Sequence, residues 1–195
     1  MTKVLAVTGP SGGHIFPALS FLDILKERQN QIDVLLVLPT SSSLEPAGYK
    51  VKRVSIYPLK LSLSFRNIRA VFSLLKGILQ SILIILAFRP DIVVGFGSLS
   101  SVPIVMLGWF FRVRTLIHEQ NVIPGRANSL LAKFSDKVAI SFEETRQHLK
   151  ISPDKIVLTG NPIRRALKKI DKSLASGFFG FRDGGFTILV MGGSG

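Results

Sequence analysis

The sequence contains no cysteine and only three histidines, His14, His118 and His148. Without cysteine, disulfide bonds, thiolate metal sites and cysteine catalysis are excluded. With so few histidines, we do not expect a metal site built from several imidazoles. Acidic residues are also scarce: the chain has 12 aspartates and glutamates but 25 lysines and arginines. Its formal net charge is therefore +13.

Long apolar runs and a secretory signal are missing as well. The longest apolar run, Ile78 to Phe88, is interrupted by Gln80 and is shorter than the roughly 20 residues of a membrane-spanning helix. No signal-peptide pattern follows Met1, so we expect a cytoplasmic protein for which contact with a membrane surface stays open. At 195 residues and 47% hydrophobic, the chain can form one large or two small domains.

Short apolar runs alternate with amphipathic segments along the chain. Strands are expected near 3–8, 33–38, 51–55, 91–95, 113–117, 137–141, 156–158 and 186–191. Helices are expected near 15–28, 65–88, 101–111, 125–134, 143–149 and 163–170. This alternation predicts an α/β fold, a Rossmann-like and mostly parallel sheet with helices on both faces. Ligands bind such sheets at the carboxyl ends of the strands, where the sequence places the loops 8–14, 95–101, 118–125 and 159–164.

The first of these loops carries the most information. Gly12 and Gly13 follow a strand and precede a helix, so backbone N–H groups at the helix N-terminus can approach an anionic ligand. His14 adds an imidazole at the mouth of this site. The spacing differs from the Gly-x-Gly-x-x-Gly dinucleotide fingerprint, and a tight turn with an exposed histidine is the alternative.

The other three loops are weaker signals when each is taken alone. Residues 95–101 form a glycine and serine loop whose backbone can approach a ligand. Residues 118–121, His-Glu-Gln-Asn, offer four consecutive polar side chains suited to a sugar or peptide, or else form a hydrated loop. They lack the second histidine of a zinc-binding His-Glu-x-x-His motif. In the last loop, Arg164 is expected to face the cleft.

The basic residues concentrate in the middle of the chain. Residues 49–114 hold ten basic residues and one acidic residue, a net charge of +9. Within them, the expected helix 65–88 has apolar residues every three or four positions, typical of a core-facing helix or of a helix on anionic lipid. We favour the second interpretation. The candidate membrane contacts are Phe65, Arg66, Ile68, Arg69, Phe72, Lys76 and Trp109.

Taken in order, these motifs resemble the MurG family of glycosyltransferases. The resemblance rests on residues 11–19, 118–121 with Pro124-Gly125, 160–164 and 192–194. Members add N-acetylglucosamine (GlcNAc) from UDP-GlcNAc to lipid I, undecaprenyl-pyrophosphoryl-MurNAc-pentapeptide, and so make the peptidoglycan precursor lipid II. The resemblance implies the GT-B fold of two Rossmann-like domains, of which this chain is the N-terminal half.

The resemblance also implies domain boundaries and residue roles. Residues 1–164 would bind the acceptor, 165–185 would form an interdomain linker and helix, and 186–195 would begin a donor-binding domain that is otherwise missing. His14 would be the general base for the acceptor hydroxyl. Leu99 stands where the family often has tyrosine. The implied donor-binding residues are Ser11, Gly12, Gly13, Asn121, Arg164 and Ser194, and the implied acceptor-binding residues are Gly97, Ser98, His118 and Glu119.

The implied reaction is an inverting sugar transfer without cofactor or tightly bound metal. We expect a peripheral protein on the cytoplasmic face of the inner membrane, whose partners are UDP-GlcNAc, lipid I, an anionic membrane surface and the missing donor domain.

Two alternatives stay open: a non-catalytic acceptor-binding or membrane-anchoring subunit of a split transferase, and a glycolipid synthase acting on diacylglycerol. A nucleic-acid binder is least favoured, because the aromatic residues have core or bilayer spacing. Alone, the chain is predicted to have little or no transferase activity.

Overall fold

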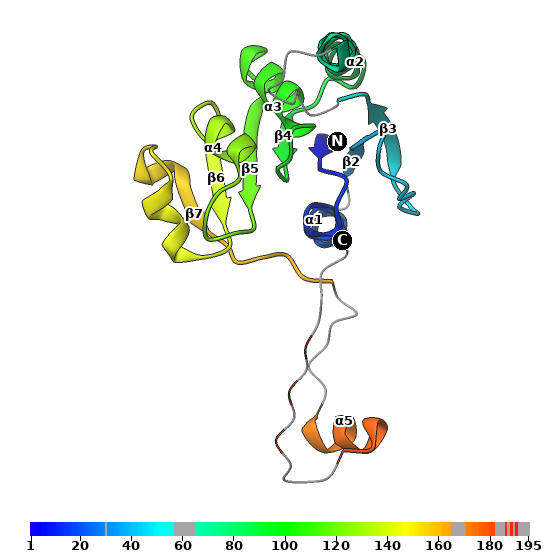
Figure 1. The fold of residues 1–195 in the computed structure, drawn as a ribbon, viewed down its shortest axis with the longest axis vertical. Coiled ribbons are helices and arrows are strands. Elements are labelled where there is room, and N and C mark those ends of the chain that lie inside the picture. The colour runs from blue at the N-terminus through cyan, green and yellow to red at the C-terminus, as the bar shows by residue number, and fades with distance from the viewer. Residues whose placement is uncertain are drawn as a thin grey trace.

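The computed structural model describes residues 1–29, 31–56, 65–164 (side chains from residue 72 on), 171–181, and positions 186, 188 and 190. Within them the strands are β1 (Thr2–Val7), β2 (Ile32–Pro39), β3 (Lys50–Val54), β4 (Ile92–Gly95), β5 (Arg114–Glu119), β6 (Lys137–Ile140) and β7 (Ile156–Leu158). The strands form one parallel sheet in the order β3-β2-β1-β4-β5-β6-β7 (Figure 1). The predicted parallel α/β fold is confirmed.

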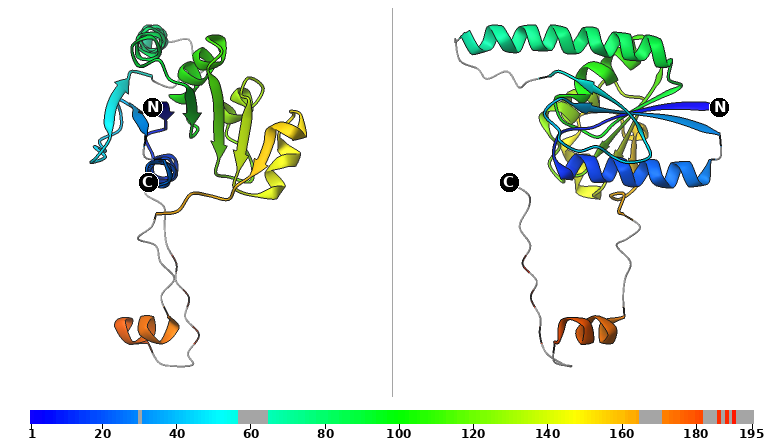
Figure 2. Two further views of the ribbon diagram at one scale, coloured as in Figure 1. Left: turned by 180° about the vertical axis from the view of Figure 1, so that it is seen from behind. Right: turned by 90° about the vertical axis from the view of Figure 1, so that its right-hand side faces the viewer.

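Helices cover both faces of this sheet. The α-helices are α1 (Gly12–Arg28), α2 (Phe65–Phe88), α3 (Ser101–Phe110), α4 (Arg126–Leu131) and α5 (Lys172–Phe179). Short 3-10 helices are η1 (Glu143–His148) and η2 (Pro153–Lys155). Figure 2 shows α1 and α2 on opposite sides of the sheet. No helix in the described part of the chain is long and apolar enough to cross a membrane.

The order of the strands in the sheet indicates where a ligand binds. Strands β1 to β3 follow one another toward one edge, whereas β4 to β7 follow one another toward the other edge. Because such connections are right-handed, α1 packs on one face, and α2, α3 and α4 pack on the opposite face. The order reverses between β1 and β4, and the loops after these two strands diverge there. Open α/β sheets bind ligands at such a point.

The central strands are buried on both faces. In β1, Leu5 and Val7 belong to the core beneath α2 and α3, whereas Val4 and Ala6 belong to the core beneath α1. All four side chains are at most 2% exposed. Apolar residues on consecutive positions are what a parallel sheet covered by helices requires.

Several element boundaries differ from the prediction. Helix α1 begins at Gly12 rather than near residue 15, because the N–H groups of His14 and Ile15 both donate to Ser11 O at 3.0 Å. Residues 143–148 form a 3-10 helix, and α4 ends at Leu131 instead of 134. Ile163 and Arg164 are not helical, and the rest of the expected helix 163–170 lies outside the described residues.

The C-terminal boundaries stay a prediction. Helix α5 is capped by Asp171, whose side chain accepts a hydrogen bond from Ser173 N, and its C-cap is Gly180, with a φ of 66°. Of the expected strand 186–191, only Phe186, Ile188 and Val190 are described, and these three are exposed and outside any strand.

Candidate functional site

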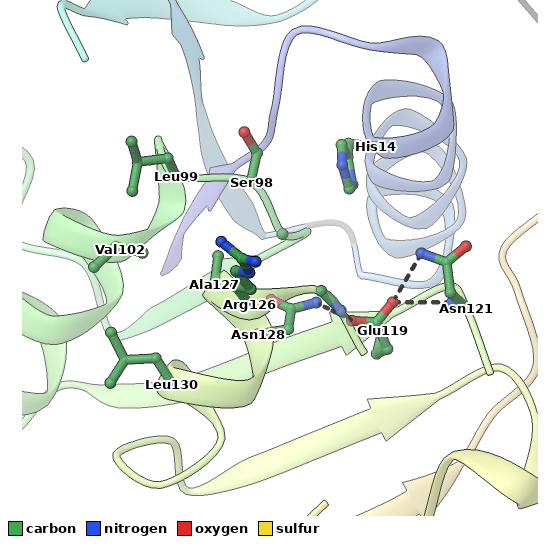
Figure 3. A pocket seen from close by; sticks show the side chains of 12 residues that line it. His14, Ser98, Leu99, Val102, Glu119, Asn121, Arg126, Ala127, Asn128 and Leu130 are labelled. Carbon is green, nitrogen blue, oxygen red and sulfur yellow. Dashed lines mark hydrogen bonds between the residues drawn. The ribbon is translucent and has the colours of Figure 1, made fainter. Parts of the chain in front are cut away.

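A cleft with a volume of about 510 Å³ opens at the carboxyl ends of the central strands (Figure 3). It is formed by the first turn of α1, the β4–α3 loop, the end of β5 and the first turn of α4. Its lining residues are His14, Gly97, Ser98, Leu99, Val102, Glu119, Asn121, Gly125, Arg126, Ala127, Asn128 and Leu130. The cleft therefore brings together His14, Gly97, Ser98, Glu119 and Asn121, five predicted site residues from three separate loops.

Two glycines allow the loops around His14 to approach this closely. A Cβ atom on Gly97 would lie 3.1 Å from His14 Cε1, and Gly97 has a φ of +85° that favours glycine. A Cβ atom on Gly9 would lie 2.5 Å from Ser98 Cβ and 2.8 Å from His14 Cδ2. Gly9 was not among the predicted site residues, because its importance comes from a contact with a loop about ninety residues away.

His14 is held between these loops with one ring nitrogen enclosed. The Nδ1 atom is buried and has no hydrogen-bond partner among the described residues. Figure 3 shows His14, Ser98 and Arg126 around the same opening. An enclosed imidazole nitrogen without a partner is uncommon in native structures, and it makes His14 a candidate for proton transfer at this cleft.

The buried Glu119 side chain holds one wall of the cleft in place through hydrogen bonds. The carboxylate is 2% exposed. Its Oε1 accepts hydrogen bonds from the N–H of Asn121 at 2.9 Å and from Asn121 Nδ2 at 3.2 Å. Its Oε2 accepts from the N–H of Gly125 at 3.1 Å and from Asn128 Nδ2 at 2.9 Å. Four donors use the roughly four acceptor positions of a carboxylate, so Glu119 shapes the loop 120–125, and its predicted contact with an acceptor stays a prediction.

Asn121 and Asn128 are both held by this carboxylate but differ in exposure. Asn121 is exposed at the cleft, and its amide oxygen remains available after Nδ2 binds Glu119. Asn128 is 2% exposed and also donates to His118 O at 3.0 Å, while its Oδ1 has no partner among the described residues. The prediction missed Asn128. The available signal was a polar residue at a buried position of the expected helix 125–134.

A family model for the glycosyltransferase family 28 N-terminal domain matches residues 4–140. The chain belongs to glycosyltransferase family 28. The chain is 35% identical over 198 aligned residues to the UDP-N-acetylglucosamine–N-acetylmuramyl-(pentapeptide) pyrophosphoryl-undecaprenol N-acetylglucosamine transferase of Alkaliphilus metalliredigens, covering 99% of the chain and 54% of that protein. The chain is 33% identical to the enzyme of the same name from Clostridioides difficile, and the alignment covers 100% of the chain and 49% of that enzyme.

Solved structures give the same fold for this family 28 chain. Acinetobacter baumannii MurG superposes with a TM-score of 0.69 at 24% identity, covering 88% of this chain and 50% of that one. UDP-GlcNAc 2-epimerase from Methanocaldococcus jannaschii superposes with a TM-score of 0.60 at 15% identity, covering 82% and 46%. The resemblance to MurG and the Rossmann-like GT-B fold are confirmed, and the chain spans about half the length of the curated relatives it matches.

His118 lies on the opposite face of the family 28 sheet from Glu119. It is 4% exposed, with Nε2 3.1 Å from Gly160 O and Nδ1 3.2 Å from Gln120 Nε2. Because a carbonyl only accepts, Nε2 carries the hydrogen and Nδ1 accepts the second bond. The structure thus places His118 outside this cleft, and its predicted contact with the acceptor stays a prediction. His118 and Glu119 end strand β5, where neighbouring side chains alternate between faces.

The burial of His118 makes folding depend on pH. Burial is the main cause that lowers the pKa of His118, outweighing the opposing effects of Gly160 and Glu119. The unfolded chain then takes up a proton below about pH 6.5, whereas the folded chain takes it up only at lower pH. The contribution of neutral His118 to stability is complete above about pH 6.5 and is lost as the pH falls through the folded pKa.

We therefore expect the free energy of unfolding to decrease from about pH 7.5 to pH 5.5, the range around the ordinary histidine pKa. Urea unfolding at both pH values measures it. His118→Gln should flatten this dependence, whereas His148→Gln at an exposed position should leave it unchanged. An equal slope in wild type and His118→Gln contradicts the assignment.

The predicted donor-binding residues are only partly brought together. Ser11, Gly12 and Gly13 form the start of α1 beside the cleft without lining it. The Arg164 guanidinium lies 4.3 Å from the ring centroid of Phe16, one turn into α1, and so stands next to this helix start. Ser194 lies outside the described residues.

The predicted membrane-contact residues lie mainly on α2. The side chains of Phe65, Arg66, Ile68 and Arg69 are outside the described residues, whereas Phe72, Lys76 and, on α3, Trp109 are exposed. The outer stripe of α2 consists of side chains that are each more than half exposed, namely Phe72, Leu75, Leu79, Leu83 and Leu86. Beside it, an apolar groove of about 410 Å³ between α2 and α3 shares Leu99 and Val102 with the cleft.

Proposed function

We propose that this chain is the acceptor-binding half of an inverting transferase that moves GlcNAc from UDP-GlcNAc to lipid I and forms lipid II. The observation that carries the proposal is His14, enclosed at the cleft of a family 28 domain with its Nδ1 unpartnered. The relatives' names describe this transfer. The apolar groove that adjoins the cleft suits an acceptor with a polyprenyl tail.

In the proposed reaction His14 is the general base. The acceptor hydroxyl gives its proton to the imidazole while its oxygen forms a bond to the anomeric carbon of GlcNAc. The bond from that carbon to the diphosphate oxygen breaks on the opposite side, and UDP leaves with the electron pair. Asn121 and Arg164 are the proposed donor contacts, with the backbone of Ser11 to Gly13 at the helix start.

We expect no metal in this reaction. Within the described ranges, no group of three or more His, Cys, Asp or Glu side chains gathers as metal ligands do. The positive end of α1 and the guanidinium of Arg164 are the groups proposed to stabilise the leaving diphosphate. Transfer that persists in excess chelator supports this, and transfer abolished by chelator and restored by Mg²⁺ contradicts it.

The test is a transfer assay with UDP-GlcNAc and a lipid I analogue. It compares this chain with a polypeptide that continues it over the length spanned by its relatives, called the extended polypeptide below. We expect lipid II from the extended polypeptide and little or none from the 195-residue chain. Activity that appears only when a separate donor-domain chain is added supports the alternative, an acceptor-binding subunit of a split transferase. No transfer in any combination refutes the proposal.

We further infer that the outer stripe of α2, with Lys76 and Trp109, contacts an anionic membrane on its cytoplasmic face. Exposed apolar side chains at helical spacing, in a basic part of the chain, are typical of interfacial helices. The 195-residue chain should cosediment with phosphatidylglycerol vesicles more strongly than with neutral phosphatidylcholine vesicles. Leu79→Glu should weaken this binding about tenfold, an effect of the size expected for one buried apolar side chain.

Ile163→Glu is the matched control for this experiment. Ile163 is 62% exposed and lies beyond β7, so Ile163→Glu adds the same negative charge away from the outer stripe of α2. Equal weakening by both substitutions would show a net-charge effect and would refute the proposed membrane face.

A further inference from the structure

Two enclosed polar atoms in the cleft wall have no hydrogen-bond partner among the described residues. They are Nδ1 of His14 and Oδ1 of Asn128. Both side chains line the cleft on either side of Gly97. Since a buried polar atom without a hydrogen bond is unfavourable, the presence of two of them in the wall of one cleft calls for an explanation.

The geometry at Gly97 shows that the two side chains converge. A Cβ atom on Gly97 would lie 3.2 Å from His14 Nδ1 and 3.3 Å from Asn128 Nδ2. The imidazole edge and the Asn128 amide therefore border the same small space. Gly97 keeps that space free of a side chain, and its φ of +85° favours glycine there.

The orientation of the Asn128 amide is set by its other contacts. Its Nδ2 donates to His118 O at 3.0 Å and to Glu119 Oε2 at 2.9 Å, and both of these atoms only accept. Exchanging the amide oxygen and nitrogen would lose both bonds and place two oxygens against Oδ1. Oδ1 is therefore the unpartnered atom, and it requires an N–H or O–H donor.

We propose that Asn128 is the positioning residue of His14. Its Oδ1 accepts the hydrogen bond of His14 Nδ1–H across one enclosed water molecule. A histidine that donates from Nδ1 keeps its lone pair on Nε2. This inference rests on the proposed function, in which Nε2 is then the atom that accepts the proton of the acceptor hydroxyl.

Glu119 completes this arrangement without touching His14. Its two oxygens already accept four N–H groups, so it is not available to the imidazole. Instead it fixes the Asn128 amide, and that amide orients the imidazole. His14 thus differs from a triad histidine, whose Nδ1–H is held directly by a carboxylate.

The test reads the tautomer of His14 by long-range ¹H–¹⁵N correlation NMR on the 195-residue chain, at a pH where the imidazole is neutral. We expect Nδ1–H to predominate in the wild type and Nε2–H to predominate in Asn128→Ala. Asn121→Ala is the control, because it removes another amide from Glu119 and leaves Asn128 in place. It should retain the Nδ1–H tautomer.

A second variant covers the case in which Asn128→Ala does not fold. Gly97→Ala keeps both side chains and the bonds to Glu119 but places a methyl group between the imidazole and the amide. It should likewise lose the preference for Nδ1–H. A wild-type chain with mainly Nε2–H, or folded Asn128→Ala and Gly97→Ala variants that keep Nδ1–H, overturns the proposal.

The same variants in the extended polypeptide separate this inference from the proposed function. Asn128→Ala should lower kcat about tenfold or more while KM for UDP-GlcNAc stays nearly constant, as expected for loss of an orientation effect. If NMR shows the expected tautomers and no variant or wild type transfers GlcNAc, the positioning of His14 stands and only the proposed function fails.

Discussion

His14→Ala in the extended polypeptide is expected to lower kcat for GlcNAc transfer by about 100-fold to 10,000-fold, the range attributed to general-base catalysis. The KM for UDP-GlcNAc should change by less than about threefold, because an interaction made only in the transition state affects kcat. The imidazole is enclosed between the loops that carry Gly9 and Gly97, so truncation removes the base without removing a predicted donor contact. Steady-state kinetics with a lipid I analogue measures both constants.

The control for this prediction is His148→Ala. His148 ends the 3-10 helix η1 at an exposed position and does not line the cleft. The His148→Ala variant should retain wild-type kinetics. If His14→Ala weakens UDP-GlcNAc binding as much as it lowers kcat, the residue is a binding group and the assignment as base is wrong.

Glu119→Gln is expected to reduce the free energy of unfolding of the 195-residue chain by about 2–4 kcal/mol, the range for disrupting several buried hydrogen bonds to a charged group. The wild-type carboxylate accepts four N–H groups from Asn121, Gly125 and Asn128. In the variant, the amide NH₂ must face two of these donors, which then lose their acceptor. Urea unfolding followed by circular dichroism measures the change.

Glu144→Gln makes the same chemical change at an exposed position of η1. It should change stability by no more than about 0.5 kcal/mol, as expected for surface substitutions. A similar small loss for Glu119→Gln would mean that the loop 120–125 is not held by the carboxylate.

The strands and most helices could be predicted because their signals are local. Buried parallel strands appear as short apolar runs, such as Val93-Val94 in β4 and the run 138–140 in β6. Helix α2 occupies the predicted range 65–88. The loops at the carboxyl ends of the strands were predictable for the same reason, since a parallel sheet places all these ends at one edge.

The site residues were predicted less well, because side-chain direction depends on where a strand ends. Reading 118–121 as one polar loop placed His118 and Glu119 together in the cleft. In the structure β5 continues to Glu119, so these two side chains point to opposite faces. Asn128 and Gly9 were missed because their roles arise from contacts with distant loops.

The sequence by itself determined the parallel α/β fold, membership of a glycosyltransferase family and the presence of His14 at a glycine turn after the first strand. Apolar patterns and short motifs carry these properties along the chain. Only the tertiary structure decided which polar side chains share the cleft, that Glu119 is saturated by N–H donors, and that the His14 imidazole and the Asn128 amide both border the space beside Gly97. These contacts join loops that follow β1, β4 and β5, and their distances exist only after the sheet has brought those strands side by side.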